Sequence, residues 1–318
     1  MPPKTRRQPL ADVVRVGGQP VPRARRKLSV RKADDQQIHE LSQLTELREL
    51  LVRGSCTDIA PLAALENLRH LDVEHTGVSD LSALAGLPLR TLLLADTSVS
   101  DLTAIASLPE LRLLQLGRTA VDDLTPLAGL TQLHSLDADE SRVVGLEPLS
   151  HCPSLEFLLL NETAVVDLSP LHGLPNLAHL ELTSCAVVDL EPLQAAPLRY
   201  LDLDEVQAPK LPSRTWPQLT HLILDHSAIT EIDTLRAAPK LQELSLCCTT
   251  ISDLTPVAEG HELRVIRLDD TPVTDLRPLH ALPQLEHVVL TRTRASSQEI
   301  NALREAQPGA TISNVPRS

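Results

Sequence analysis

The chain has 318 residues, of which 42% are hydrophobic and only 1% aromatic, and its formal net charge is −13. One Trp, one Tyr and one Phe cannot fill the interior of a conventional α/β enzyme of this length, so we expect an aliphatic, uniform core. No run approaches the roughly 18 apolar residues of a membrane span, and the first residues lack the apolar region of a secretory signal. Five cysteines without a CxxC spacing argue against a disulfide framework or a structural zinc site. We therefore expect no membrane insertion and a cytoplasmic location.

Residues 1–33 differ from the rest of the chain in charge. They contain ten Lys or Arg residues against one acid, Asp12, so the remaining chain is more acidic than the total suggests. Five prolines and Gly17-Gly18 interrupt the segment, which predicts a basic disordered tail over 1–33. Such a tail can bind nucleic acid, an anionic membrane or an acidic protein through charge, or fold back on the acidic body.

A short helical cap is expected over residues 34–46. Asp34 or Asp35 can cap its first turn, and the apolar residues then recur every three positions. These residues are Ile38, Leu41 and Leu44. Since a terminal repeat would otherwise expose core leucines, we expect this helix to cover the first repeat.

Residues 47–294 repeat one short pattern twelve times. One copy runs from Leu111 to Leu130 as LRLLQLGRTAVDDLTPLAGL, and most copies follow at a spacing of 22 residues, with single-residue slips. The copies begin at Leu47, Leu68, Leu89, Leu111, Leu133, Leu155, Leu177, Leu198, Leu219, Leu241, Leu263 and Leu285. Such regularity indicates a repeat architecture in which each unit buries its apolar side against its neighbours.

Each part of the unit predicts a local structure. The segment around LxL alternates, so its leucines point to one side of a short strand. Asp-Leu-x-Pro-Leu, as from Asp123 to Leu127, places a capping carboxylate before a proline of the first turn, which predicts a short helical or 3₁₀ turn. A recurrent Thr or Ser, such as Thr119, is expected to satisfy backbone groups between units. The recurrent Asp is explained by capping better than by calcium binding.

The unit LxxLxLxxTxVxDLxPLxxLPx resembles the 22-residue leucine-rich repeat of bacterial internalins and of the phosphatase-regulating SDS22-like proteins, over about residues 44–294. It departs from the commonest version in having Thr or Ser where Asn usually stands. The resemblance implies an α/β fold: a curved leucine-rich repeat solenoid, or horseshoe, with a parallel concave β-sheet and short helical or 3₁₀ turns on the convex side. It also implies an interaction module, in its more specific form a regulatory subunit of a phosphatase or kinase.

A second cap is expected over residues 295–318. Ser296 and Glu299 fit a capping box, Ile300 and Leu303 share one face of the following helix, and Ala310–Ile312 can add a last strand. We expect no catalytic domain beyond the array, no cofactor and no enzymatic activity.

The outward-facing strand residues form the concave surface, and the only Phe and Tyr fall on it at one equivalent position. Aromatic anchors surrounded by carboxylates are typical of a surface for a basic protein partner. The predicted partner-binding residues are Phe157, Leu159, His179, Glu181, Tyr200, Asp202, Asp204, His221, Ile223 and Asp225. Nucleic acid is expected to bind only through the tail. Sparse Lys beside abundant Arg and Ala is typical of GC-rich bacterial genomes.

Two other interpretations concern the same surface. His179, His221, Asp202, Asp204 and Asp225 include the residue types of a metal site, but the two histidines lie two strands apart, about 10 Å, on either side of Tyr200. A hydrolytic pair of Asp202 and Asp204 would need a water-poor pocket to raise one pKa, and we expect an open, solvated face instead.

One unit is irregular. Residues 204–217 lose Asp-Leu-x-Pro-Leu, and Trp216 takes the place of a leucine, which predicts its burial. The loop from Gln207 to Arg214 either borders the binding surface or reflects drift. Cys185 occupies a rung of the Thr/Ser ladder and is expected to be buried, while the Cys247-Cys248 pair is expected to be inert.

Overall fold

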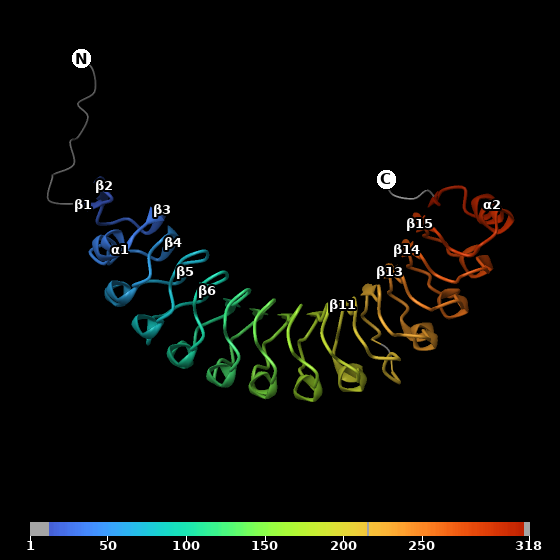
Figure 1. The fold of residues 1–318 in the computed structure, drawn as a ribbon, viewed down its shortest axis with the longest axis horizontal. Coiled ribbons are helices and arrows are strands. Elements are labelled where there is room, and N and C mark those ends of the chain that lie inside the picture. Colours follow the sequence, from blue (N-terminus) through green and yellow to red (C-terminus); the bar gives the residue numbers. More distant parts are fainter. Residues whose placement is uncertain (1–12, 215, 315–318) are drawn as a thin grey trace, which may run out of the picture.

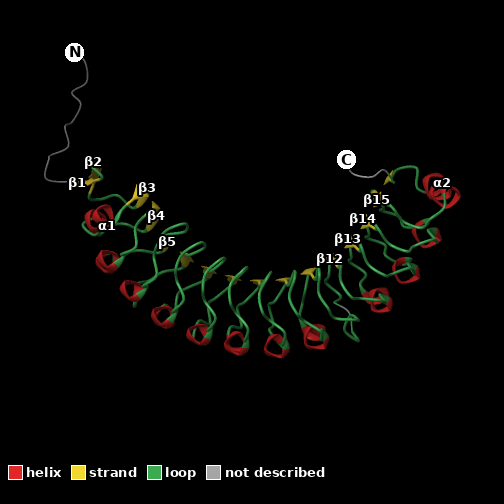
Figure 2. Cartoon of the chain, viewed as in Figure 1, coloured by secondary structure: helices red, strands yellow, loops and turns green. Residues whose placement is uncertain are grey.

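The chain forms one curved solenoid in the computed structural model, which describes residues 13–214 and 216–314 (Figure 1). Fourteen strands of this part form one sheet along the inside of the arc, and short helical turns cover the outside (Figure 2). Every neighbouring pair in this sheet is parallel. The predicted α/β solenoid with a parallel concave sheet and short turns on the convex side is confirmed.

Twelve strands of the described chain belong to the repeats, one in each unit. They are β4 (Glu49–Gly54), β5 (His70–Asp72), β6 (Thr91–Leu93), β7 (Leu113–Gln115), β8 (Ser135–Asp137), β9 (Phe157–Leu159), β10 (His179–Glu181), β11 (Tyr200–Asp202), β12 (His221–Ile223), β13 (Glu243–Ser245), β14 (Val265–Arg267) and β15 (His287–Val289). The central residue of each points inward and is fully buried, as Leu136, Leu158 and Leu180 show. Burial of these aliphatic columns is the main stabilising term of the fold.

The convex side carries one 3₁₀ turn in each of ten units of the described chain. The turns are η2 (Ala60–Ala64), η3 (Ser82–Leu84), η4 (Thr103–Ser107), η5 (Thr125–Leu127), η6 (Glu147–His151), η7 (Ser169–Leu171), η8 (Glu191–Ala195), η9 (Asp233–Ala237), η10 (Thr255–Val257) and η11 (Arg277–Leu279). The recurrent aspartate holds the start of eight of these ten turns, as where the Thr125 amide donates to Asp123 Oδ1 at 2.8 Å. The N-cap of this turn is Leu124, and Asp123 lies one position before it. The aspartate therefore accepts from the first turn as predicted, but from the position before the N-cap.

The Thr and Ser hydroxyls of the ladder bond to a carbonyl of their own unit, which corrects the expectation that they satisfy backbone groups between units. The rung at Cys185 does reach across, since its thiol donates to the Leu160 carbonyl of the preceding unit at 3.1 Å. The Thr119 hydroxyl donates to the Leu116 carbonyl at 2.6 Å, and its equivalents do the same. This bond closes a tight turn in which the preceding residue, Arg118, has a φ of 55°. Eleven equivalent non-glycine residues share that left-handed conformation: His75, Asp96, Arg118, Glu140, Glu162, Ser184, Glu205, His226, Cys248, Asp270 and Arg292. Because none of these residues is glycine, the residue type does not indicate the left-handed turn.

No 3₁₀ turn lies among the described residues between β11 and β12, in the irregular unit. Trp216 fills the interior there instead: its side chain is fully buried, and its indole N–H donates to the Leu193 carbonyl at 2.7 Å. The predicted burial of Trp216 is confirmed. One large ring therefore replaces the aliphatic packing of a regular unit.

The N-terminal segment is folded, so the prediction of a disordered tail is wrong for residues 13–33. Strands β1 (Val13–Val16) and β2 (Gln19–Pro22) form an antiparallel hairpin, and β3 (Lys27–Ala33) pairs in parallel with β4. Val14, Val16 and Val30 are buried in the same core as the repeats, which explains the order despite the prolines and arginines. Residues 1–12 lie outside the described part.

Both ends of the core are covered. Helix α1 (Asp35–Leu41) has Asp34 as its N-cap, with a capping box to Gln37. Helix α2 (Ser297–Ala306) begins with the Ser296 hydroxyl accepting from the Glu299 amide at 3.1 Å, and β16 (Thr311–Ser313) pairs with β15. No helix of residues 13–214 and 216–314 is long and apolar enough to cross a bilayer.

Replacing Thr119 by Val tests the intra-unit bond. The change keeps the shape but leaves the buried Leu116 carbonyl without its donor, so we expect the free energy of unfolding to fall by about 1–2 kcal/mol. Urea unfolding followed by Trp216 fluorescence measures it. Thr131→Val is the control because Thr131 is exposed; equal losses in both variants would contradict the role of the bond.

Candidate binding face

The centre of the concave side carries a ladder of rings on adjacent strands. Phe157, His179, Tyr200 and His221 are in register across β9 to β12. Their ring centroids lie 5.6, 4.2 and 5.9 Å apart in that order, and the His179 and Tyr200 rings are nearly parallel, at 3°. His134 adds a ring edge-on to Phe157 at 5.5 Å. The Phe157 and Tyr200 side chains thus lie on the sheet surface, outside the leucine interior.

The other predicted residues continue this surface in two more rows. In register beside the rings lie Leu159, Glu181, Asp202 and Ile223, and Asp204 and Asp225 follow the ends of β11 and β12. The structure therefore brings all ten predicted residues together on four strands and their exits. Their role in binding stays a prediction.

The pKa values of two carboxylates on this surface, Glu181 and Asp202, are shifted in opposite directions. Glu181 lies 2.7 Å from His179 Nε2 and accepts from the Asn161 amide at 2.8 Å, and these contacts lower its pKa. Burial instead raises the pKa of Asp202 to about 6. The expectation of a uniformly solvated face is therefore wrong for Asp202, because neighbouring strands crowd its carboxylate.

The structure adds Asp137 and Asp139 to the site. Burial raises the pKa of both carboxyls, to about 6 for Asp139. Asn161 bridges the two groups of acids, since its side-chain amide lies 3.2 Å from Asp139 Oδ2 and 2.8 Å from Glu181. The sequence places Asp137 and Asp139 on the concave side, but their burial depends on the neighbouring unit, which the pattern does not show.

Some acidic side chains of the concave side form ion pairs with arginines of the same chain, and others do not. Toward the N-terminal end, Arg53 pairs with Asp72 and, at 2.8 Å, with Glu74. Toward the C-terminal end, Arg267 lies 3.6 Å from Glu243.

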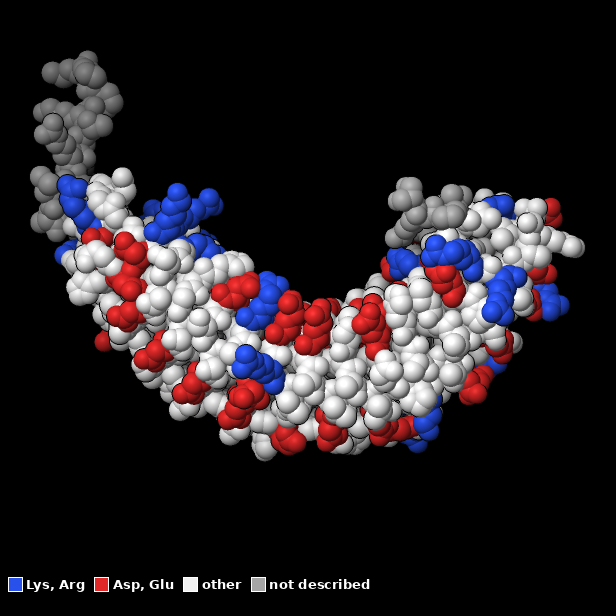
Figure 3. Space-filling view, in the orientation of Figure 1, with Lys and Arg blue, Asp and Glu red and all other residues white. Residues whose placement is uncertain are grey.

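Between them, no Lys or Arg of the described residues forms an ion pair with the central carboxylates, which we define as Asp137, Asp139, Glu181, Asp202, Asp204 and Asp225. Among the described residues, the ion pairs of these carboxylates are with histidines, as with His226, which lies 3.0 Å from Asp204. Figure 3 shows acidic side chains along the middle of the inner rim.

The arrangement offers no recognisable metal centre. Within residues 13–214 and 216–314, no three His, Cys, Asp or Glu side chains are grouped so that they could hold an ion. His179 and His221 lie on opposite sides of Tyr200 in the register. The set of His179, His221, Asp202, Asp204 and Asp225 is therefore not a metal site in this geometry.

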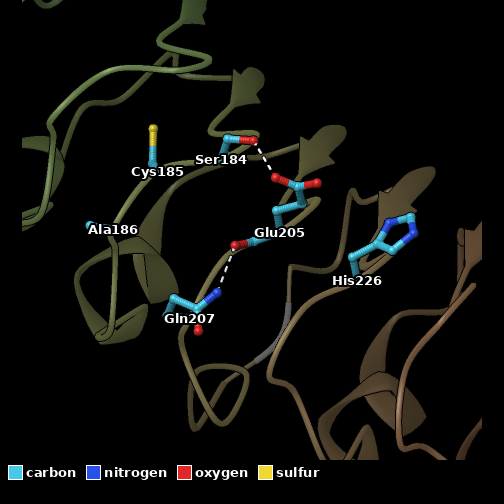
Figure 4. Close-up of a pocket in the computed structure, with 6 residues that line it drawn as sticks. All are labelled: Ser184, Cys185, Ala186, Glu205, Gln207 and His226. Atoms are coloured by element: carbon cyan, nitrogen blue, oxygen red, sulfur yellow. Dashed lines mark hydrogen bonds between the residues drawn. The ribbon is translucent and has the colours of Figure 1, made fainter.

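A shallow depression of about 500 Å³ lies beside the irregular unit (Figure 4). In it the Ser184 hydroxyl donates to Glu205 at 2.6 Å, and the Gln207 amide donates to the Glu205 carbonyl at 3.0 Å. It is lined by Ser184, Cys185, Ala186, Glu205, Gln207 and His226. Burial raises the pKa of the Cys185 thiol, so this cysteine is not activated as a nucleophile.

The vicinal cysteines are also unactivated. Burial raises the pKa of Cys247 to about 11 and also raises that of Cys248, which acidic neighbours reinforce. Both thiols are free. A reactive thiolate pair needs the opposite environment.

The parallel concave sheet, the leucine columns and the 3₁₀ turns define a leucine-rich repeat protein. Its repeats are similar to those of an internalin from Listeria monocytogenes, which is 25% identical with a TM-score of 0.78 over 85% of this chain and 81% of that chain.

Two further solved structures share the fold. A leucine-rich repeat protein of Leptospira interrogans is 19% identical, with a TM-score of 0.72 over 90% of this chain and 89% of that one. The ectodomain of the Arabidopsis thaliana receptor kinase GASSHO1/SCHENGEN3 is 17% identical, with a TM-score of 0.65 over 91% of this chain and 40% of that one. No protein-family model and no curated protein sequence matches the chain.

The raised carboxyl pKa values predict a pH dependence of stability. Asp139 and Asp202 titrate near 6 when folded, above the value near 4 of an unfolded chain. The folded state therefore binds more protons between these values, and the free energy of unfolding rises as pH falls from about 7 to about 5. We expect a gain of about 1 kcal/mol, reduced by partial exposure of both groups.

Urea unfolding at the two pH values measures this gain. The variant Asp139→Asn with Asp202→Asn is the control, because it keeps the histidines and removes the two titrating carboxyls. An identical pH dependence in the variant and the wild type would contradict the assignment.

Proposed function

We propose that the chain is a non-catalytic, cytoplasmic scaffold that holds a basic partner protein against the centre of its concave face. The observation that carries this proposal is the contrast among the concave acids: Asp72, Glu74 and Glu243 have arginine partners, and the central carboxylates have no Lys or Arg partner among the described residues. Buried carboxylates without a cation are costly, and a cation supplied by another molecule removes that cost.

The ring ladder supports the same kind of ligand. The stacked His179 and Tyr200 rings lie beside Glu181 and Asp202, so a guanidinium can lie over a ring face while its N–H groups reach a carboxylate. Arginine suits this arrangement better than lysine, because its planar guanidinium can stack on a ring and donate two hydrogen bonds to one carboxylate.

Three further observations favour a binding role over catalysis. The concave face is open, the described thiols are unactivated, and the fold is shared with a receptor ectodomain solved in complex with CASPARIAN STRIP INTEGRITY FACTOR 2. The free thiols agree with a reducing compartment. A scaffold of this kind can serve as a regulatory subunit, because occupying a basic surface changes what else that surface can bind.

An oligoarginine peptide tests the face directly by isothermal titration calorimetry. We expect measurable binding to the wild type and an affinity at least about tenfold lower for Asp139→Asn with Asp202→Asn. Tyr200→Leu should also weaken binding, by about threefold or more, since it removes the stacking ring; β7 has Leu113 at the equivalent position.

The matched control removes two carboxylates from the convex side, in Asp101→Asn with Asp123→Asn. Asparagine can still accept the turn bonds that these residues form. Equal affinity of all variants for the peptide would refute the concave site.

A further inference from the structure

The folded N-terminal segment carries cations that the chain itself leaves largely without carboxylates. Residues 13–33 contain no acid, and among their cations only Lys27 forms an ion pair with a described residue, at 2.6 Å with Glu49. Side chains of Arg15, Arg23 and Arg25 donate to backbone carbonyls instead. The basic end is defined by Arg15, Arg23, Arg25, Arg26, Lys27, Arg31 and Lys32, all of them exposed.

Part of this basic end lies on the concave side. Lys27 and Arg31 of β3 are in register with Glu49 and Arg53 of β4, and Val30 between them is buried. Figure 3 shows basic side chains at the N-terminal end of the arc, apart from the acidic middle. The same molecule therefore presents an uncompensated basic surface and an uncompensated acidic one.

These two surfaces cannot meet within one molecule. Strand β3 is fixed in the sheet beside β4, and five strand spacings separate it from β8, a distance of about 24 Å along the sheet. The central carboxylates begin at β8, beyond the reach of any side chain of β3. Strand β3 thus does not fold back on the acidic face, and another molecule can complement the charge that the Lys27–Glu49 pair leaves over.

We propose that two copies of this chain associate, with the basic end of one seated on the central carboxylates of the other. The inference rests on the proposed function, because it uses the same acidic face and names a partner for it. Two reciprocal contacts give a two-fold dimer, and one contact per pair gives an open chain. Guanidinium groups such as Arg26 and Arg31 meet both the carboxylates and the ring ladder.

Ionic strength decides how this association is measured. Each copy has a net charge of −13, so the molecules repel at long range. At about 0.1 M salt the Debye length is about 10 Å, which screens that repulsion and leaves contacts between touching groups. At about 1 M it falls to about 3 Å, and the contacts weaken.

Sedimentation velocity on the full chain tests the proposal. At about 0.1 M salt the mass should rise with protein concentration above the 34.7 kDa of one chain, and at about 1 M it should return to that value. The basic-end variant Arg26→Glu with Arg31→Glu and the acidic-face variant Asp139→Asn with Asp202→Asn should each self-associate at least about tenfold more weakly. Arg112→Glu with Arg142→Glu is the matched control, since both arginines are exposed outside the two surfaces.

Mixing the two defective variants gives the decisive measurement. One retains its acidic face and the other its basic end, so the mixture should form a complex that neither forms alone. A wild type that stays monomeric at about 0.1 M overturns the inference, as does a mixture that stays monomeric.

The oligoarginine titration separates this failure from that of the proposed function. If the wild type binds the peptide but never itself, only the self-association is refuted, and a shift of duplex DNA by the basic end would assign that surface to nucleic acid. If it binds neither, both proposals fail.

Discussion

Every feature of this molecule depends on one constraint: a unit of about 22 residues cannot bury its own apolar side. Three-residue strands and single 3₁₀ turns have too few contacts to fold alone, so each unit is held by the leucine columns of its neighbours. The interior is therefore aliphatic and almost identical from unit to unit. Residues that differ between units therefore lie on the surfaces, the concave one among them.

The concave face shows how a regular backbone presents irregular chemistry. Parallel register places equivalent residues side by side, so one substitution per unit becomes a continuous row of rings or of carboxylates. Crowding within such a row shifts the pKa values of its carboxyl groups. Asp202 is partly buried by its neighbours, which raises its pKa. The turn aspartates of the convex side lie in water instead, and hydrogen bonds from the Thr125 side chain and amide lower the pKa of Asp123.

The sequence predicts most of this fold because the repeated leucines determine three things at once: where each strand lies, where each turn lies, and which side chains point into the core. The same periodicity places Phe157, Tyr200 and the eight other predicted residues on one surface. The periodicity does not predict features that depend on contacts outside the repeated pattern. Val14, Val16 and Val30 order the N-terminal strands through contacts with the end of the array. Gly17-Gly18 between two short runs is a local signal for the hairpin, but the arginines and prolines around it favour the prediction of disorder. The buried state of Asp139 and the left-handed turn at Arg118 likewise depend on neighbouring strands and on the carbonyl that Thr119 reaches.

The unit around Trp216 has a consequence for how the array comes apart. In a linear array, free energy is shared between intrinsic terms and nearest-neighbour junctions, and cooperativity passes from unit to unit. The row of convex turns is interrupted between η8 and η9, where the Trp216 indole donates to the Leu193 carbonyl of η8, while β11 and β12 stay paired on the concave side. The junction after η8 therefore differs from the others on its convex side, and amide exchange should report a different opening energy there.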